Sequence, residues 1–278
     1  MRIIFDNQVL SNTISAASEN ANYPVSNLND SRLSRKYRAG GLTDQWILIS
    51  GSNIKASYVA IMNHNLTANA TVLIQGNDTN DFSNPAYSEV ISPDWHTMIK
   101  EVANTVGIET PGNLYGGDLY GGGLYGPSII SEVPKEFNYW RISISDSMNT
   151  DGYIEIGGIY LAEFVQMQNV ESGMVLAHNT TARSSISGSG QAYGDPNYKF
   201  RGRDFSMIAN TFEKREEILT MFEAMDNFRP VLALIWEDDL LTEKPMYSVI
   251  ARENLSYTKT LINFTGVLAF QMSLRETF

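Results

Sequence analysis

The sequence predicts an all-β protein, and three of its features indicate this. Short runs rich in β-branched and aromatic residues recur along the chain, bounded by Gly, Asn, Ser or Asp, which is the strand-and-turn rhythm of a β-sandwich. Hydrophobic residues make up 43% of the chain and charged residues only 18%, which is enough apolar surface to bury real cores. The length of 278 residues favours two such cores.

Charge and composition exclude several classes of function. The formal net charge is −11 and the strongest basic cluster is Arg35-Lys36-Tyr37-Arg38, so a nucleic-acid backbone would be repelled. The chain has no cysteine, which excludes disulfides and thiolate metal sites. Its first residues lack the apolar stretch of a signal peptide, and no run is long and apolar enough to span a membrane. We therefore expect no membrane insertion and a protein that is made in a cytoplasm.

The first predicted domain covers residues 1–163. A short strand at Arg2 to Phe5 precedes a long polar loop, and the boundary near residue 164 is placed where the composition changes after Glu163. The further strands predicted in this domain are Gln45 to Ile49, Ser57 to Met62, Ala70 to Gly76, Tyr139 to Ser145 and Gly152 to Leu161.

Residues 113–126 repeat the unit Leu-Tyr-Gly three times. Their glycines disfavour both a regular helix and a regular strand, which predicts a long loop tip. The loop can be a flexible connection between strands. Alternatively it is a contact loop, because Tyr beside Gly is typical of adaptable recognition surfaces; its candidate contact residues are Tyr115, Tyr120 and Tyr125.

The second predicted domain covers residues 164–278. It begins with a Ser-, Gly-, Asn- and Thr-rich stretch at 169–197, which suits a hairpin or an extended arm. Asn210 can cap a helix, and Glu213 stands at the spacing of a capping box, so a helix is predicted at about 211–226. Four of its residues form one apolar stripe, which predicts packing on a sheet: Ile218, Leu219, Phe222 and Met225.

Three strands are predicted after the helix. They are Val231 to Trp236, Met246 to Arg252 and Leu261 to Arg275. The last alternates apolar and polar residues over about 14 positions, which at about 3.3 Å per residue gives about 45 Å, longer than a small sandwich needs. This length favours the wall of a barrel or ring whose polar face meets water or a neighbouring subunit.

The pattern of chemically active residues favours a protein without catalytic activity. The three histidines show no metal-ligand spacing, and His64, at a strand end, is expected to hydrogen-bond a turn. No Gly-x-Ser-x-Gly motif occurs, and the acidic turn Glu237-Asp238-Asp239 is expected to be solvated. Asn77, Asp78 and Asp81 can supply oxygen ligands to calcium or can simply form turns. We predict no enzyme, no cofactor and no metal site.

If the first domain binds a sugar, four loop residues are the candidates. They are Tyr37, Arg38, Trp95 and His96, because an aromatic ring packs on a pyranose while Arg and His donate to hydroxyls. The alternative is that Tyr37 and Trp95 fill one end of the sandwich.

Residues of about 23 to 163 resemble the galactose-binding-like (discoidin-type) jelly-roll superfamily, in the version common in tail proteins of bacteriophages. The segments that carry this resemblance are Tyr23-Pro-Val-Ser-Asn-Leu28, Gln45-Trp-Ile-Leu-Ile-Ser-Gly51, Ala56-Ser-Tyr-Val-Ala-Ile-Met-Asn-His-Asn-Leu66, Ala70-Thr-Val-Leu-Ile-Gln-Gly-Asn77, Tyr139-Trp-Arg-Ile-Ser-Ile144 and Tyr153-Ile-Glu-Ile-Gly-Gly-Ile-Tyr-Leu161. The resemblance implies a jelly-roll sandwich.

Residues of about 164 to 278 resemble, in element order, the tail-tube and distal-tail β-barrel of long-tailed phages. Those proteins close six-fold rings at the tail tip, and some carry a carbohydrate-binding-like domain. The resemblance implies a tail-tube-like β-barrel or sandwich with one helix, in a virion protein assembled in the host cytoplasm.

Two functional hypotheses follow. The first is a ring-forming adaptor of a phage tail tip or baseplate, expected to be a hexamer, whose jelly roll contacts other tail proteins (tube, hub, fibres) or host glycans. The second is a free-standing, lectin-like carbohydrate-binding protein. A third, an enzyme acting on host glycans, requires an acidic pair that the sequence does not reveal.

Overall fold

The computed structural model confirms the predicted all-β class. It describes residues 2–67, 69–91, 129–166, 175–180, 184–186, 192–194, 199–209, 212–224, 230–234, 246–250, 256–258 and 268–276. Within these residues the chain forms two compact units, one from Asp6 to Phe164 and one that joins the residues before Asp6 to those from Val165 onward.

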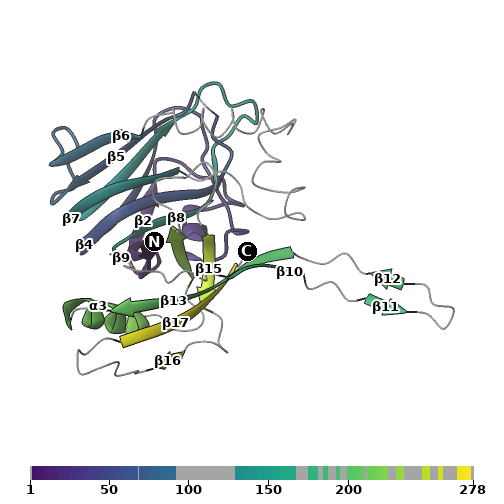
Figure 1. Ribbon diagram of the computed structural model, residues 1–278. Coiled ribbons are helices and arrows are strands. Elements are labelled where there is room, and N and C mark those ends of the chain that lie inside the picture. Colours follow the sequence, from purple (N-terminus) through teal and green to yellow (C-terminus); the bar gives the residue numbers. More distant parts are fainter. Residues whose placement is uncertain are drawn as a thin grey trace. The chain divides into compact units, whose positions relative to one another are not determined.

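The jelly-roll unit is a seven-stranded antiparallel arrangement (Figure 1). Its strands run in the order β3-β8-β4-β7-β5-β6, and β2 pairs with β4. Their bounds are β2 Thr13–Ala16, β3 Tyr37–Arg38, β4 Gln45–His64, β5 Thr71–Asn77, β6 Tyr87–Ile91, β7 Ile129–Ser145 and β8 Glu155–Ala162.

Strand β4 is one long strand where the sequence predicts two. Its pairing with β7 shifts register between Ser50 and Ile54 and again between Ala56 and Tyr58. Asn53 adopts a left-handed conformation with φ of 52°. The segment between the two predicted strands, which includes Gly51 and Asn53, thus forms an irregularity of the β-bulge kind within one strand.

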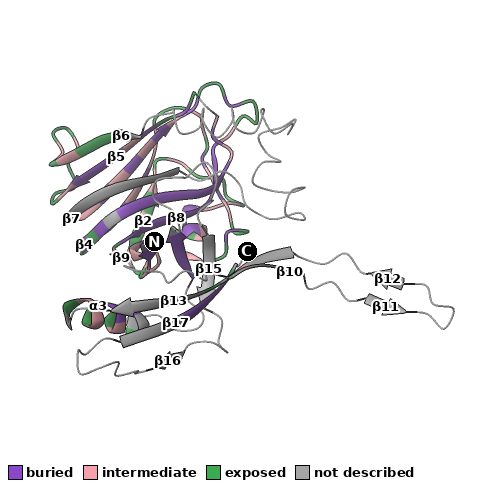
Figure 2. Ribbon diagram, in the orientation of Figure 1, coloured by how far each residue is buried: buried purple, intermediate pink, exposed green. Residues whose placement is uncertain are grey.

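The core of this unit gathers around Trp140, which is fully buried. The rings of Phe137 and Tyr87 meet it edge to face, with centroids 5.4 and 5.9 Å away, and its Nε1 donates to the carbonyl of Ile54 at 3.1 Å. Figure 2 shows buried residues running along β4, β5 and β8. An indole with its N–H satisfied fixes how the strands pack.

The second unit contains an eight-stranded sheet in the order β10-β13-β17-β15-β14-β1-β9, with β16 paired to β17. The bounds are β1 Arg2–Ile4, β9 Phe164–Gln166, β10 Val175–Thr180, β13 Lys199–Ala209, β14 Val231–Leu234, β15 Met246–Ile250, β16 Ser256–Thr258 and β17 Leu268–Glu276. Within the described residues β10 and β9 end the order without pairing to each other, so the sheet is open and the barrel alternative is not realised there.

The N-terminal strand lies in a different unit from the one in which the sequence analysis placed it. Its residues pair with β14 in the register Arg2↔Leu234, Ile3↔Ala233 and Ile4↔Leu232. The first domain therefore does not include residues 2–4. A three-residue strand has no local sequence pattern that indicates so distant a partner. The pairing depends on β14, which can accept β1 only once the sheet of the second unit has formed.

Helix α3 spans Phe212–Ala224, within the predicted range. Ile218 and Met221 are fully buried while Leu219 is half-buried, so the packed face is rotated slightly from the predicted stripe. Asn210 and Met225 lie outside the described residues. No helix in the described part of the chain is long and apolar enough to cross a membrane.

Some predicted elements lie partly or wholly outside the described residues. The final strand is described from Leu268, so residues 261–267 of the predicted 14-residue alternation, like the Leu-Tyr-Gly repeat and the acidic turn at 237–239, lie outside the described residues. In the stretch at 169–197, for which the sequence favours a hairpin or an extended arm, β11 (Ser184–Ile186) pairs with β12 (Ala192–Gly194), and β10 pairs with β13.

Candidate functional site

The candidate site lies where the short strand β3 joins the jelly roll. Arg38 N–H donates to the carbonyl of Tyr23 at 3.1 Å, and Asn20 N–H donates to the carbonyl of Arg38 at 2.9 Å. On its other side β3 pairs with β8, placing Arg38 opposite Glu155. These backbone bonds fix Arg38 between the loop that carries Tyr23 and the start of β8.

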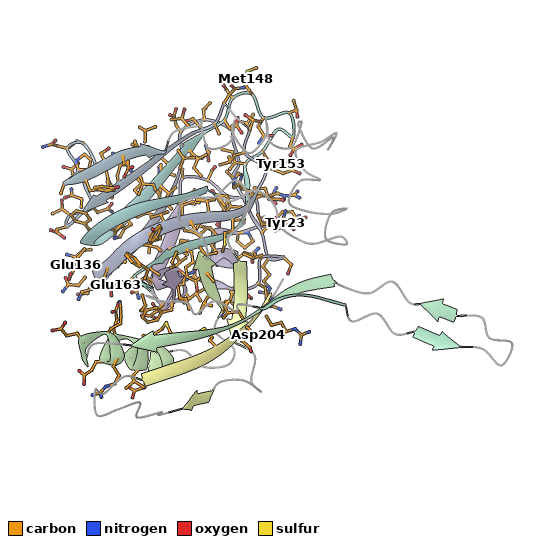
Figure 3. The ribbon with its side chains drawn as sticks, viewed as in Figure 1. Tyr23, Glu136, Met148, Tyr153, Glu163 and Asp204 are labelled. Atoms are coloured by element: carbon orange, nitrogen blue, oxygen red, sulfur yellow. The ribbon has the colours of Figure 1, made fainter. Side chains whose placement is uncertain are left out.

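The guanidinium of Arg38 lies between two tyrosine rings. Its Cζ is 3.9 Å from the ring centroid of Tyr23 and 4.3 Å from that of Tyr153, and Figure 3 shows both labelled tyrosines on the same side of the unit. Each ring face attracts the cation. The two rings are half-buried, so this stack reaches the surface of the domain.

The carboxylate of Glu155 holds the guanidinium of Arg38 in place. Its side chain is only 10% exposed; Oε2 accepts from Arg38 Nε at 2.5 Å, and Oε1 accepts from Lys36 Nζ. The hydrogen bond from Glu155 raises the pKa of Arg38 above its ordinary value, which favours the charged guanidinium. Two cations share one carboxylate, which leaves the cluster of Lys36, Arg38 and Glu155 with one positive charge.

The terminal nitrogens of Arg38 are the groups available to a ligand. Its side chain is 27% exposed, and in the described part of the chain only Nε has a hydrogen-bond partner. The two Nη nitrogens therefore present a planar fork of N–H donors between two aromatic rings. Such a fork matches adjacent hydroxyls of a sugar or the two oxygens of a carboxylate.

Tyr37 is not an exposed ligand residue, and its prediction as one is corrected. Its ring is 1% exposed, and its hydroxyl donates to the carbonyl of Ser18 at 2.8 Å. Burial, with a contribution from Glu19, raises the pKa of Tyr37 to about 12. In a two-residue strand the neighbour of an outward Arg38 must point inward. Tyr37 thus fills the end of the sandwich, as in the alternative interpretation.

The other sequence-predicted site residues, Trp95, His96, Tyr115, Tyr120 and Tyr125, lie outside the described residues. Sequence reasoning did not assign Tyr23, Tyr153, Glu155 or Lys36 to a site. Glu155 is 117 residues from Arg38. The one sequence feature that pointed to Glu155 was the basic cluster at 35–38, because basic side chains that become partly buried need an acidic partner.

His64 and Asn65 are structural residues. His64 Nδ1 accepts from the N–H of Leu66 at 3.1 Å, which confirms the prediction that it hydrogen-bonds a turn. The Asn65 side chain donates to Tyr153 O at 2.9 Å and accepts from Glu155 N at 2.7 Å. Asn65 therefore holds the two residues that surround Arg38.

The polar groups at 77–83 are occupied by local turns. Asn77 Nδ2 donates to the carbonyl of Asp81 at 2.5 Å, and Asp81 Oδ1 accepts from Ser83 N at 2.9 Å. Across the described residues no group of three His, Cys, Asp or Glu side chains is arranged to hold a metal ion.

Comparison with known proteins finds resemblance only in solved structures; no family model and no curated protein matches the chain. A fucose-binding module of Streptococcus pneumoniae matches 57% of this chain and 98% of its own, at 12% identity and a TM-score of 0.37. The family 32 CBM of C. perfringens NanJ, solved with galactose, matches 59% and 100% at 14% identity and a TM-score of 0.37. A chitosan-binding module from Paenibacillus sp. IK-5 matches 57% and 99%, at 13% and 0.36. Similarity at this level does not assign a ligand to this chain.

Proposed function

We propose that this chain is a structural, non-enzymatic protein of a phage tail tip. The second unit forms a ring, expected to hold about six chains, that joins the tail tube to the baseplate. The jelly roll contacts neighbouring tail proteins or glycans of the host surface. The protein is assembled in the host cytoplasm and resides in the virion tail.

The observation that carries this proposal is the insertion of the jelly roll into the second unit. Strands β1 and β9 are neighbours in the sheet order, and the whole jelly roll lies between them in sequence. The sheet of the second unit thus includes the N-terminal strand β1, and the jelly roll is inserted between β1 and β9. We call the second unit the frame. Domain insertions succeed where the two ends of the inserted part are close together.

This organisation favours the tail-tip hypothesis over a free-standing lectin. A carbohydrate-binding module that acts alone needs no second sheet interleaved with its termini. The combination of two domains is also found in the tail-tip proteins described above, some of which carry a carbohydrate-binding-like domain.

Light scattering on the full chain, followed by negative-stain electron microscopy, tests the proposal. We expect a mass of about six chains and ring-shaped particles, as implied by the resemblance to ring-forming tail proteins. A monomer that forms no ring, alone or with a tail-tube protein, would contradict it.

The lectin-like function is the second candidate, and it is favoured by the Nη fork of Arg38, which has no hydrogen-bond partner among the described residues. A glycan array gives the ligand, and titration calorimetry then gives its affinity for the wild type and two variants. Arg38→Lys keeps the charge but loses the planar fork, so we expect at least a tenfold loss of affinity, which is about 1.4 kcal/mol.

Arg35→Lys is the matched control, because Arg35 is a 53% exposed arginine of the same segment that pairs with Asp30 at 3.3 Å. Its affinity should equal that of the wild type. Binding of no glycan by the wild type, or equal effects of the two variants, would remove this candidate.

A further inference from the structure

One face of the jelly-roll sheet carries a single charged side chain, that of Arg141. Figure 1 shows β4, β7, β5 and β6 side by side, and successive residues of each strand point to opposite faces. On β7, Trp140 and Ile142 are buried in the core, so Arg141 between them lies on the outward face. The outward positions described on β5, on β6, at 45–50 of β4 and at 139–145 of β7 hold no other charged residue.

Two neighbours orient the guanidinium of Arg141. Gln75 Oε1 accepts from Nε at 2.9 Å and from Nη2 at 2.7 Å, and the Gln75 side chain is itself buried. The Cζ of Arg141 lies over the ring of Phe82, 4.2 Å from its centroid. An amide oxygen at one edge and an aromatic ring at one face hold the cation in a defined orientation.

Arg141 retains donors for a ligand. A guanidinium has five N–H groups, and Gln75 accepts from two of them. The other three, two on Nη1 and one on Nη2, have no hydrogen-bond partner among the described residues. A carboxylate binds the Nη1 and Nη2 end of a guanidinium through two parallel hydrogen bonds. The end of Arg141 that points away from Gln75 is therefore suited to a carboxylate.

Arg141 lacks an acidic partner in the part of the chain that the structure describes, where Arg38 is paired with Glu155. Partial burial lowers the pKa of Arg141 below its ordinary value, because removal from water disfavours the charged form. A partly desolvated cation without a counter-charge gains free energy when a partner supplies an anion. Charge complementarity therefore favours an anionic ligand on this face.

Apolar side chains adjoin Arg141 on the same face. Leu48 of β4 lies directly opposite Arg141. Two residues along, Ser143 of β7 lies between Trp46 of β4 and Leu73 of β5, and all of these side chains are half-buried. Diagonal neighbours on adjacent strands have Cβ atoms about 7 Å apart. The indole of Trp46 is thus within reach of a ligand whose carboxylate is bound by Arg141.

The central position of these strands favours a sugar over a peptide as the ligand. A peptide that adds to a sheet pairs with the free backbone groups of an edge strand. β7 and β5 each have a paired strand on both sides, so a ligand on this face is bound by side chains alone. A pyranose ring stacks on an indole, and its carboxylate and hydroxyls fit Arg and Ser side chains.

We propose that this face binds an acidic polysaccharide, with the carboxylate of one sugar on the Nη end of Arg141 and a sugar ring on Trp46. We call it the outer-face site, and its residues are Trp46, Leu48, Leu73, Arg141 and Ser143. It lies on β4, β7 and β5, whereas the candidate site around Arg38 lies on β3 and β8. The inference goes beyond the proposed ring and does not depend on it.

Binding of the full chain to immobilised polysaccharides is the first test. Biolayer interferometry is run on polygalacturonate, alginate, hyaluronan and polysialic acid, which carry their carboxylates on different sugars, and on neutral dextran. We expect binding to at least one of the four acidic polymers and none to dextran. Binding to none of the four, or equal binding to dextran, would overturn the inference.

Titration calorimetry then tests the role of Arg141. The ligands are an oligosaccharide of the polymer that binds best and the same oligosaccharide with its carboxyl groups reduced to alcohols. For the wild type, reduction should weaken binding by about tenfold or more. Arg141→Gln should weaken binding of the acidic form by a similar factor and should bind both forms equally. An unfolded variant would bind neither, so retained binding of the reduced form shows that Arg141→Gln folds.

Two further variants separate stacking and general charge from this contact. Trp46→Ala should weaken both forms of the oligosaccharide by the same factor, because stacking does not require the carboxylate. Arg35→Gln is the matched control, since Arg35 is a 53% exposed arginine of the jelly roll and loses the same charge. It should bind as the wild type does.

Three outcomes would overturn the inference at this stage. Arg141→Gln may bind the acidic form as the wild type does, or Arg35→Gln may lose as much affinity as Arg141→Gln, which indicates attraction by net charge alone. If Arg38→Gln abolishes binding and Arg141→Gln does not, the acidic sugar belongs to the candidate site. The mass of the full chain tests the proposed ring separately, so these failures leave that proposal standing.

Discussion

At the scale of single residues, Glu155 organises the candidate site. It is a nearly buried carboxylate that holds Lys36 and Arg38 at once, and its own backbone N–H is fixed by Asn65. A buried charge is tolerated only when it is paired and hydrogen-bonded. The orientation of the Arg38 fork thus depends on a residue that offers nothing to a ligand itself.

Replacing Glu155 with Gln should destabilise the jelly roll by about 1 to 3 kcal/mol, because two partly buried cations lose their carboxylate. Urea denaturation measures the loss. Glu136→Gln, at an exposed position, should change the free energy of unfolding by less than about 0.5 kcal/mol. Equal effects of the two substitutions would show that Glu155 does not anchor the cluster.

Asp30 should contribute to a loss of stability in acid. Hydrogen bonds from Arg32 lower the pKa of Asp30 from 3.8 to about 2 in the folded protein. Since the folded value lies below the unfolded one, the contribution is complete above about pH 4 and disappears as pH falls to about 2. The pair is near the surface, so its size is about 0.5 kcal/mol.

The difference in unfolding free energy between the wild type and Asp30→Asn, measured by urea denaturation at several pH values, checks this. It should be about 0.5 kcal/mol at pH 7 and vanish near pH 2. A difference that stays constant with pH would mean that the carboxylate charge is not responsible.

At the scale of elements, close packing between strands determines where glycine is required. Gly76 lies on β5 opposite Trp140 of β7, and a Cβ added to it would lie 2.2 Å from a ring carbon of Phe137. That separation is impossible for real atoms. The aromatic cluster around Trp140 therefore depends on the absence of a side chain at position 76.

Gly76→Ala should destabilise the jelly roll by about 1 to 3 kcal/mol through overpacking, as measured by thermal and urea denaturation. Phe137→Leu in the same chain should recover part of the loss, because the smaller side chain makes room. Gly41→Ala is the control, since its Cβ would meet only the flexible end of Gln45 at 3.1 Å. A Gly76→Ala protein as stable as the wild type would refute this packing.

At the scale of the whole molecule, the chain forms two units, and a short N-terminal strand belongs to the sheet of the second. Ile3 and Ile4 on β1 are completely buried, although they lie close to the first residue, Met1. The frame is completed only after β14 has formed and the first residues have paired with it. Pairing over a long sequence separation slows folding, because the loop must close before the contact is formed.

Ile3→Ala should therefore destabilise the second unit by about 2 to 5 kcal/mol and leave the jelly roll intact. Hydrogen exchange followed by mass spectrometry distinguishes the units: protection should fall in β14 and β15 and persist in β4 and β7. Loss of protection in β4 and β7 instead would place β1 with the jelly roll, as the sequence analysis had it.

The candidate site could be predicted from the sequence only in part. Arg38 was identified as a loop residue that can donate to sugar hydroxyls, and its role as a donor stays a prediction. Its tyrosine neighbours were recognised only as ends of strand segments, and Glu155 was not identified at all. A pair separated by 117 residues leaves no pattern in a single sequence, whereas burial of Tyr37 follows from alternation once β3 is known.

The sequence by itself determined the all-β class, helix α3 and the approximate positions of strands β5, β8, β14 and β15, because these depend on local periodicity, capping and composition. Only the tertiary structure decided that β4 is continuous, that β1 completes the second sheet and that Arg38 is held by Glu155 between two tyrosines. The physical reason is that strand partners and buried ion pairs join residues far apart in the chain. Their free energy comes from contacts that exist only after the sheets have assembled.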